Sequence, residues 1–401
     1  MANVSSSNGL EKRPKLRFPG FDESYKQCRI GDIYAERSQR GASDMELLSV
    51  TMNDGVMPRS EIEGKDNSSE DKSNYKVVLT GDMVYNSMRM WQGANGISPC
   101  DGIVSPAYTV LMPKIPISNG YFAAFFKSPN LINEFRKNSQ GMTSDTWNLK
   151  YPQIETIKVC IPALSEQNRV ADMLRTLERR IAKQAQLVDN LKKYKRGVVR
   201  TLLSPDSCCI EETTWTTAKI GDLGSFTKGA PLSKADITPD GTPFILYGEL
   251  YTTYHEVINS VIRRTKAQPE KQYYSHVGDV IIPTSGETPE EISTAACVML
   301  PDIILAGDLN IFRSSKIDGR IMSYILNHIV NGQIARIAQG KSVVHIQASE
   351  ISKIEISYPD YNTQCKMISV FETVGARIKS AENELTYLRT MQKALLQQLF
   401  I

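Results

Sequence analysis

The chain has 401 residues, of which 41% are hydrophobic, and its formal net charge is +3. This length allows two domains with cores of their own, and the weak charge neither demands nor excludes a nucleic-acid partner, because binding depends on local charge. No apolar run reaches membrane-spanning length, and residues 1–20 lack the apolar segment of a signal peptide. The seven cysteines are odd in number and scattered, so we expect a reduced, cytoplasmic protein without a membrane partner.

A polar segment, residues 1–17, opens the chain, and we expect it to be a mobile tail. The first domain is expected over residues 18–161. Its apolar runs, such as 78–85 and 102–111, are rich in β-branched residues and are mixed with short helical segments, as at 121–137. This mixture is typical of an α/β domain.

A long helix is predicted for residues 162–203. Apolar residues recur there at spacings of three and four over at least five turns, which predicts a narrow apolar seam that needs a partner helix. The seam consists of Leu174, Leu177, Ile181, Val188, Leu191 and Val198. The rest of this helix is rich in Lys and Arg, which would follow a DNA backbone, meet an acidic partner or simply be solvated.

A polar linker, residues 204–217, separates this helix from the second domain, which is expected over residues 218–358, and a second long helix is expected over residues 359–401. The second helix repeats the first, because the apolar pattern of residues 165–203 returns without a gap at residues 362–400. Its seam consists of Phe371, Val374, Ile378, Leu385, Leu388 and Leu395. Three polar residues interrupt the two seams and are expected to fix the register of the paired helices at a cost in stability; they are Gln184, Lys195 and Gln392.

The two domains also look like distant copies of each other. Ile30-Gly31-Asp32 opens the first and Ile220-Gly221-Asp222 opens the second, and in each domain a Gly-Asp pair precedes an apolar run. Duplication of a domain together with its helix implies a pseudo-two-fold internal repeat. The sequence therefore predicts two α/β domains joined and separated by two long helices that form an antiparallel coiled coil.

Enzyme signatures are weak. Gly340-Lys341-Ser342 resembles the end of a P-loop, but the first glycine of that motif would fall at Ala335, and a helix rather than a strand is predicted before it. Asp54, Glu63 and Lys65 imitate the spacing of metal-dependent nucleases, yet they lie in a polar loop. The histidines and cysteines lack paired metal-ligand spacing. We therefore expect no metal, no cofactor and no catalytic residue.

Several segments together resemble the specificity subunit of type I restriction–modification systems. The residues that carry the resemblance are the block SEQNRVADMLRTLERRIAKQ with LKKYKRGVVRTLLS (165–204), the opening PKLRFPGF (14–21), and the order domain, helix, domain, helix. Residues 84–108 and segments within 228–346 resemble two types of target-recognition sequence. The resemblance covers about residues 14–401. Family members commonly have Glu-Gln after the proline that opens the second helix, where this chain has Thr363-Gln364.

The resemblance implies a non-catalytic DNA reader. Each domain would be a target-recognition domain bound to one half of a bipartite site in double-stranded DNA, and the antiparallel helices would set the spacer. Two methyltransferase (M) subunits carrying adenosylmethionine would methylate adenine N6, and restriction and translocase (R) subunits would cut unmethylated DNA. The alternatives are a coiled-coil scaffold without DNA specificity and an enzyme with an unrecognised site.

Base reading needs polar side chains at the edge of a groove, and phosphate binding needs cations. In the first domain, the candidates are Asn86, Arg89, Trp91, Gln92 and Asn95, of which Arg89 and Gln92 are the preferred base readers, and Trp91 is as well explained as a loop anchor. In the second domain, the candidates are Lys228, Tyr247, Glu249, Tyr251, Tyr254, Ser285, Glu287, Lys341 and Ser342. Glu249 or Glu287 could accept from a cytosine amino group, whereas tyrosines at this density more often pack. Lys341 is the preferred phosphate contact, with an exposed turn lysine as the equal alternative.

Overall fold

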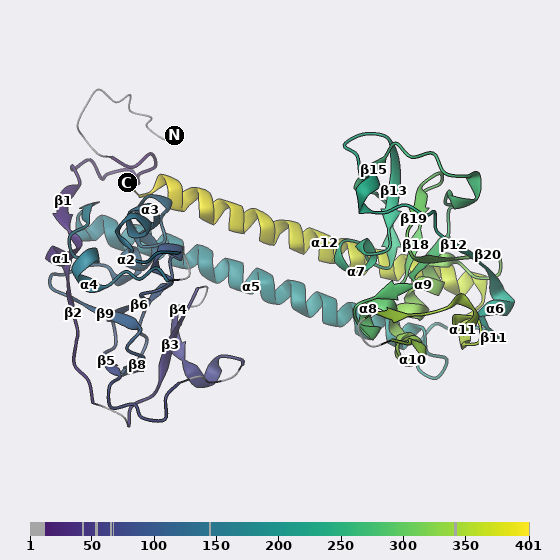
Figure 1. The fold of residues 1–401 in the computed structure, drawn as a ribbon, viewed down its shortest axis with the longest axis horizontal. Helices are drawn as coiled ribbons and strands as arrows, with labels where there is room; N and C mark the ends of the chain where they lie inside the picture. Colours follow the sequence, from purple (N-terminus) through teal and green to yellow (C-terminus); the bar gives the residue numbers. More distant parts are fainter. Residues whose placement is uncertain are drawn as a thin grey trace. The chain divides into compact units, whose positions relative to one another are not determined.

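The computed structural model describes residues 13–41, 44–52, 55–64, 66, 68–143, 146–340 and 343–400. The chain divides into two compact units (Figure 1). Unit 1 consists of Met1–Gln186 with Asn383–Ile401, and unit 2 consists of Leu187–Glu382. Two long helices, α5 (Leu164–Leu202) and α12 (Tyr361–Gln398), fall within the ranges predicted for them, and each contributes one segment to each unit. Across the described residues, no helix is long and apolar enough to cross a membrane.

Unit 1 contains the first domain, which is mixed α/β as predicted. Its largest sheet is antiparallel and runs in the order β2 (Tyr34–Glu36), β9 (Tyr108–Pro113), β6 (Met83–Asn86), β7 (Asn95–Ile97). Three further antiparallel pairs are β1 (Lys26–Arg29) with β10 (Lys158–Ile161), β3 (Leu48–Thr51) with β4 (Gly55–Pro58), and β5 (Lys76–Val78) with β8 (Gly102–Val104). The helices are α1 (Ile30–Ile33), α2 (Asn119–Phe125), α3 (Pro129–Asn138) and α4 (Tyr151–Ile154), with short 3-10 turns η1 (Arg59–Glu61) and η2 (Met90–Gln92).

The core of unit 1 is aromatic and includes the end of α12. Phe122 meets Tyr34 edge-on at a centroid distance of 5.5 Å. Phe400, just beyond α12, stacks on Phe125 at 5.3 Å and meets Tyr121 edge-on at 5.2 Å. Such pairs each add about 0.5–1.5 kcal/mol beyond the burial of their area. The first domain is therefore completed by the last helix of the chain.

Unit 2 contains the second domain, which is also mixed α/β. A five-stranded sheet has the order β12 (Gly224–Lys228), β20 (Leu309–Ser314), β16 (Asp279–Pro283), β18 (Ala296–Val298), β14 (Val257–Ile258). A three-stranded sheet has the order β15 (Arg263–Thr265), β13 (Thr242–Leu246), β19 (Ile304–Ala306), and the remaining pairs are β11 (Trp215–Lys219) with β22 (Glu355–Pro359) and β17 (Ser285–Gly286) with β21 (Val344–His345). The helices are α6 (Ile220–Leu223), α7 (Glu249–Thr252), α8 (Pro289–Ile292), α9 (Gly319–His328), α10 (Asn331–Ile337) and α11 (Ala348–Ile351), with 3-10 turns η3 (Lys234–Asp236) and η4 (Lys271–Tyr273).

The Ile-Gly-Asp motif makes the same contacts in both domains. Ile30 N and Gly31 N donate to the carbonyls of Ile157 and Glu155 at 2.9 and 3.0 Å. In the second domain, Ile220 N and Gly221 N donate to the carbonyls of Ile354 and Ser352 at the same distances. A Cβ at either glycine would lie 3.0 Å from the Cβ of the residue opposite, Glu155 or Ser352, so glycine allows the backbones to approach closely.

A second repeated contact holds each domain to the long helix that follows it. Buried Gln167 accepts from Ser118 N at 3.0 Å and donates to the Pro162 carbonyl at 2.9 Å. Gln364, the equivalent residue in α12, accepts from Asp318 N at 2.9 Å and donates to the Pro359 carbonyl at 2.8 Å. Ser118 and Asp318 are both N-cap residues, of α2 and α9. We call each such arrangement a glutamine clasp.

The residue before each clasp glutamine behaves differently in the two copies. Glu166 forms two hydrogen bonds with Arg17, at 2.9 and 2.8 Å, and accepts from Tyr25 at 3.2 Å. Thr363 instead donates to Asp360 Oδ2 at 2.9 Å. Of the expected mobile tail, residues 1–12 lie outside the described residues, whereas its end is fixed by Arg17 and by a 3.0 Å bond from Leu16 N to the Gln398 carbonyl.

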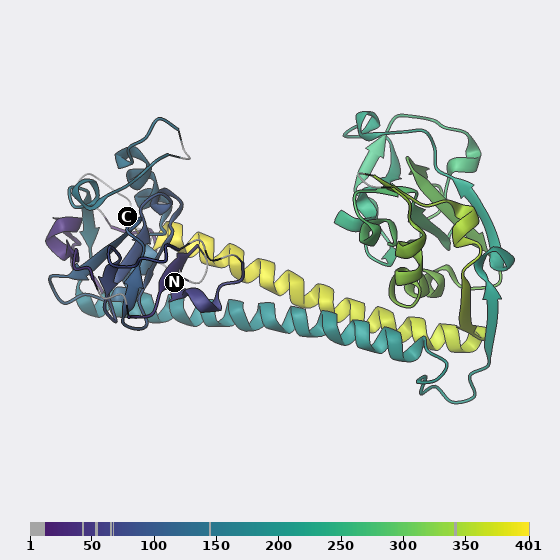
Figure 2. The same ribbon diagram turned by 60° about the horizontal axis from the view of Figure 1, so that its bottom comes forward.

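In each unit, segments of α5 and α12 lie side by side (Figure 2). In unit 1, Arg180 pairs with Glu384 at 2.7 Å; in unit 2, Lys192 pairs with Glu382 at 2.7 Å. The predicted seam residues are buried or partly buried: Leu174, Leu177, Val188, Phe371, Val374, Ile378 and Leu388 are buried, and Ile181, Leu191, Val198, Leu385 and Leu395 are partly buried. These side chains are thus at least partly shielded from solvent within each unit.

Candidate nucleic-acid interface

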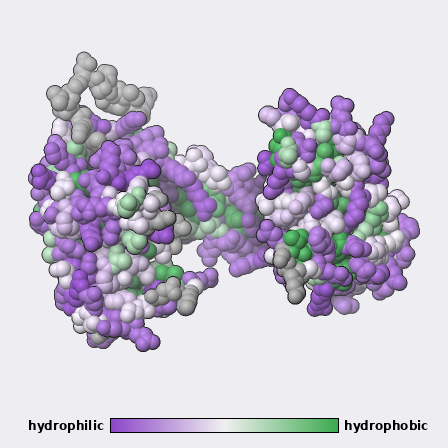
Figure 3. Space-filling model, viewed as in Figure 1, coloured by the Kyte–Doolittle hydropathy of each residue, from purple (hydrophilic) through white to green (hydrophobic). Residues whose placement is uncertain are grey.

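The surface of both units is mainly polar on the face drawn in Figure 3, and hydrophobic residues form small groups there. A surface of this kind suits a partner recognised through hydrogen bonds and charge.

The loop of residues 86–92 in the first domain is held by a dense set of hydrogen bonds. Asn86 accepts from Met88 N through Oδ1 at 3.0 Å, and its carbonyl accepts from Arg89 N at 3.0 Å. The Arg89 carbonyl accepts from Gln92 N at 2.9 Å, and the Ser87 carbonyl accepts from Leu149 N at 2.8 Å. The loop therefore has a defined backbone conformation before any partner binds.

Trp91 anchors this loop and also lines the cleft described below. Its indole N–H donates to the Met88 carbonyl at 3.0 Å, and its ring meets Trp147 edge-on at 5.2 Å. The Arg136 guanidinium lies 5.7 Å from the centre of the Trp147 ring, within cation–π range. Of the two interpretations of Trp91, the contacts support the loop anchor.

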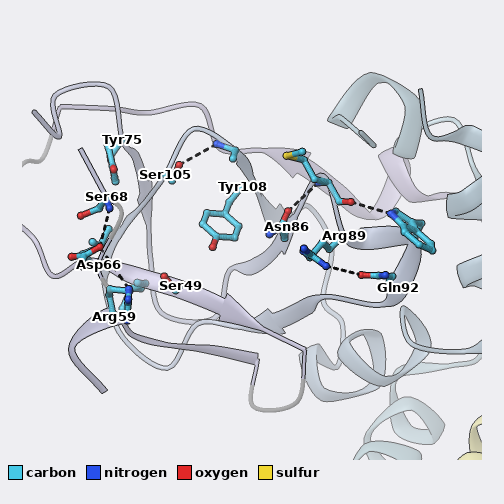
Figure 4. A pocket seen from close by; sticks show the side chains of 15 residues that line it. Ser49, Arg59, Asp66, Ser68, Tyr75, Asn86, Arg89, Gln92, Ser105 and Tyr108 are labelled. Carbon is cyan, nitrogen blue, oxygen red and sulfur yellow. Dashed lines mark hydrogen bonds and ion pairs between the residues drawn. The ribbon is translucent and has the colours of Figure 1, made fainter. Parts of the chain in front are cut away.

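The loop forms one wall of a cleft of about 720 Å³. Figure 4 shows Asn86, Arg89 and Gln92 on one side, Arg59, Asp66, Ser68 and Tyr75 on the other, and Tyr108 between them. Arg59 donates to the carbonyls of Ile62 and Gly64 at 2.7 and 3.2 Å, so its guanidinium braces its own wall. Arg89, in contrast, is exposed and makes a single long bond, 3.4 Å from Nη1 to Gln92 Oε1.

Asn95 is buried and does not line this cleft. It lies in β7 with an exposed fraction of 0%, and its amide donates to the Gly93 carbonyl at 3.1 Å. A fully buried side chain cannot reach a groove edge without unfolding its strand. Tyr108, Ser105 and Ser49 line the cleft but were not among the predicted contacts. The pairing register of β6 and β9 would have indicated Tyr108, because Tyr108 lies opposite Asn86 in that pair.

Two of the second domain's predicted contacts hold its loops in place. Glu249 is 8% exposed, accepts from Arg263 at 2.8 Å and accepts from Leu246 N at 3.3 Å. The hydroxyl of Tyr254 accepts from Ile262 N at 3.2 Å. Because both carboxylate oxygens of Glu249 already accept hydrogen bonds, this side chain is not available to a cytosine amino group in this conformation.

Three further candidates lie in or next to short helices: Tyr247 precedes α7, Tyr251 lies within it, and Glu287 precedes α8. Burial raises the pKa of Tyr251, and the negative charges of Tyr247, Glu291 and Glu287 raise it further. Glu287 is exposed, and Tyr247 and Tyr251 are partly buried.

The polar cluster around β20 includes Lys228 and Ser285. Lys228 donates to Asn310 Oδ1 at 2.8 Å, and Ser285 donates to Asp308 Oδ2 at 2.7 Å. Burial lowers the pKa of Lys228, against an opposing effect of Asp308. Lys341 and Ser342 lie outside the described residues.

The catalytic motifs considered from the sequence gain no support. Helix α10, not a strand, precedes Gly340, which is incompatible with a P-loop. Asp54 and Lys65 lie outside the described residues, and Glu63 is exposed. In the described parts of the chain, no group of three or more His, Cys, Asp or Glu side chains is arranged to hold a metal ion.

Comparison with known proteins gives the family. Residues 212–389 match the type I restriction modification DNA specificity domain. Residues 212–389 therefore belong to the DNA specificity domain family of type I restriction–modification systems. The resemblance seen in the sequence is thereby confirmed.

Solved structures of specificity subunits share the fold at low sequence identity. The S subunit of a type I restriction–modification system from M. genitalium is 14% identical, with a TM-score of 0.59, over 97% of this chain and 99% of that one. The HsdS subunit from Thermoanaerobacter tengcongensis is 14% identical, with a TM-score of 0.50, over 98% and 99%. A chain from a structure that describes complex assembly and conformational transition of the type I system is 13% identical, with a TM-score of 0.61, over 94% and 97%.

Proposed function

We propose that this chain binds double-stranded DNA at a bipartite, asymmetric site and directs a type I complex to it. Each domain takes one half-site. The observation that carries this proposal is a repeated framework with different polar surfaces. The Ile-Gly-Asp contacts and the glutamine clasp recur in both domains. The 86–92 loop of the first domain and the residues Tyr251 and Glu287 of the second differ in chemistry. A shared scaffold with different polar surfaces suits the reading of two different sequences.

The long helices are proposed to form an antiparallel coiled coil that sets the spacer between the half-sites, with a pseudo-two-fold relation between the repeats. Two observations support antiparallel pairing, one in each unit. In unit 1, the start of α5 shares a core with Leu399 and Phe400, and in unit 2 the end of α5 shares a core with Met367 and Phe371. A spacer of fixed length would convert helix length into half-site separation.

Catalysis is assigned to partners, and the chain itself is proposed to contribute no catalytic residue. Two M subunits carrying adenosylmethionine would each methylate N6 of an adenine taken out of the stack, and R subunits would cut DNA that lacks these marks. This proposal places the chain in the cytoplasm with the genome.

Mapping N6-methyladenine in the source genome, with and without this gene, tests the function directly. We expect the methylated adenines that depend on the gene to share two short sequences separated by a constant number of unspecified base pairs. A scaffold without DNA specificity would leave the methylation pattern unchanged when only the recognition loops are altered. Modified adenines with no common flanking sequence would contradict the proposal.

A further inference from the structure

Arg89 and Arg59 both line the unit 1 cleft, but only Arg89 has guanidinium donors without an acceptor among the described residues. The Arg59 guanidinium donates hydrogen bonds to the carbonyls of Ile62 and Gly64. Arg89 uses only Nη1, in a 3.4 Å bond to Gln92, and none of the described residues accepts from its Nε or Nη2. An exposed guanidinium with two adjacent free donors can make a bidentate contact.

The loop that carries Arg89 is fixed before binding. Backbone bonds join Asn86 to Arg89 and Arg89 to Gln92, and Trp91 packs on Trp147. Because the backbone is already ordered, less conformational entropy is lost when the side chain binds a partner. The contact of Gln92 with Nη1 further limits the directions in which Nε and Nη2 point.

We propose that Arg89 reads a guanine of the first half-site, with Nε and Nη2 donating to O6 and N7 in the major groove. Guanine presents two acceptors at this edge, whereas adenine presents an acceptor and a donor, so a pair of guanidinium donors favours guanine. Gln92 is a positioning residue that holds Nη1. This inference rests on the proposed function, because it needs the first domain to read DNA.

A chemical double-mutant cycle tests the contact. The full chain, assembled with its methyltransferase partner, is measured for binding to DNA in which each guanine of the half-site is replaced in turn by 7-deazaguanine, which lacks the N7 acceptor. We expect one position at which this replacement weakens binding by about tenfold, the loss expected for a charge-assisted hydrogen bond. In Arg89→Ala, binding to the normal site is weakened at least as much, and 7-deazaguanine at that position has no further effect.

Two variants serve as references. Arg40→Ala removes an exposed arginine of the same domain that lies outside the cleft and bonds Asn74; it should keep the full 7-deazaguanine effect. Gln92→Ala should weaken binding while the dependence on N7 persists. If 7-deazaguanine still weakens binding in Arg89→Ala, the proposal is overturned. It is also overturned if Arg89→Ala weakens binding equally on cognate and unrelated DNA, because that result would indicate a phosphate contact. If the unaltered complex discriminates no sequence at all, the proposed function fails instead.

Discussion

The two glutamine clasps are built on the same residue type, but the residue before the glutamine differs between them. Gln167 and Gln364 satisfy the same pair of buried backbone groups, an N-cap N–H and a proline carbonyl. Beside them, Glu166 reaches Arg17, near the start of the chain, whereas Thr363 bonds Asp360, three residues away. In this chain, the two neighbouring positions therefore have separate roles. The glutamine serves the framework, and the preceding residue serves whichever segment lies beside it.

A second difference separates the helices themselves. Lys195 of α5 forms a 2.7 Å ion pair with Glu256, whose other oxygen lies 2.8 Å from His328 Nε2. Lys195 also lies 5.4 Å from the centre of the Tyr324 ring. The equivalent position in α12 is Gln392, which carries no charge. The buried charge cluster therefore joins α5 to the second domain without an equivalent lysine in the other copy.

Lys195→Met should produce the largest loss of stability. It leaves the Glu256 carboxylate, whose side chain is only 12% exposed, without its ion-pair partner, and breaking a buried pair costs about 3–5 kcal/mol. Denaturant unfolding of the full chain measures the change. The matched variant Gln392→Met should change the free energy of unfolding by less than about 1 kcal/mol, because no charge is stranded. Equal effects of the two substitutions would contradict the asymmetry.

Acid should weaken the same cluster. Burial raises the pKa of the Glu256 carboxyl, but the hydrogen bond with His328 and the charge of Lys195 outweigh it and lower this pKa to about 2. A carboxyl with a depressed pKa stabilises the fold above its unfolded pKa of about 4.5, and this stability is lost as the pH falls towards 2. Unfolding free energies measured across that interval should fall less steeply in Glu256→Gln. An unchanged slope would remove this role of Glu256.

The clasp glutamines should have similar effects in both units. Gln167→Leu and Gln364→Leu each leave an N–H and a carbonyl without their partner, and we expect each to cost about 1–3 kcal/mol. Hydrogen exchange at the Ser118 and Asp318 amides reports the two sites separately. Protection lost at one site but kept at the other would break the equivalence of the clasps.

The residues before the two clasp glutamines should have unequal effects on stability. Glu166→Gln removes a charge-assisted bond to Arg17 and should cost about 1.5–3 kcal/mol, whereas Thr363→Val removes a hydroxyl bond and should cost about 0.5–1.5 kcal/mol. Thermal unfolding of the two variants beside the parent chain measures the difference. A larger loss from Thr363→Val would reverse the comparison.

Periodicity was sufficient to predict the long helices, because a repeated apolar seam depends only on local spacing. The Ile-Gly-Asp motifs and the Gly-Asp pairs also indicated the duplication. The aspartates of the Gly-Asp pairs are buried, with Asp82 bound to Arg37 and Asp279 bound to Arg313. The clasp was not predicted, since its partners are backbone groups that carry no sequence signal. The burial of Asn95 and the engagement of Glu249 by Arg263 depend on strand register and on contacts distant in sequence, so a list of polar loop residues cannot separate anchors from readers.

The packing of Phe400 against Tyr121 and Phe125 has a consequence for biosynthesis. The first domain is translated early, yet part of its core comes from Leu399 and Phe400. Until those residues leave the ribosome, the aromatic surface of α2 stays without its cover and is open to chaperones. A nascent chain arrested before residue 399 should therefore hold a first domain that proteases cut more readily than the finished one.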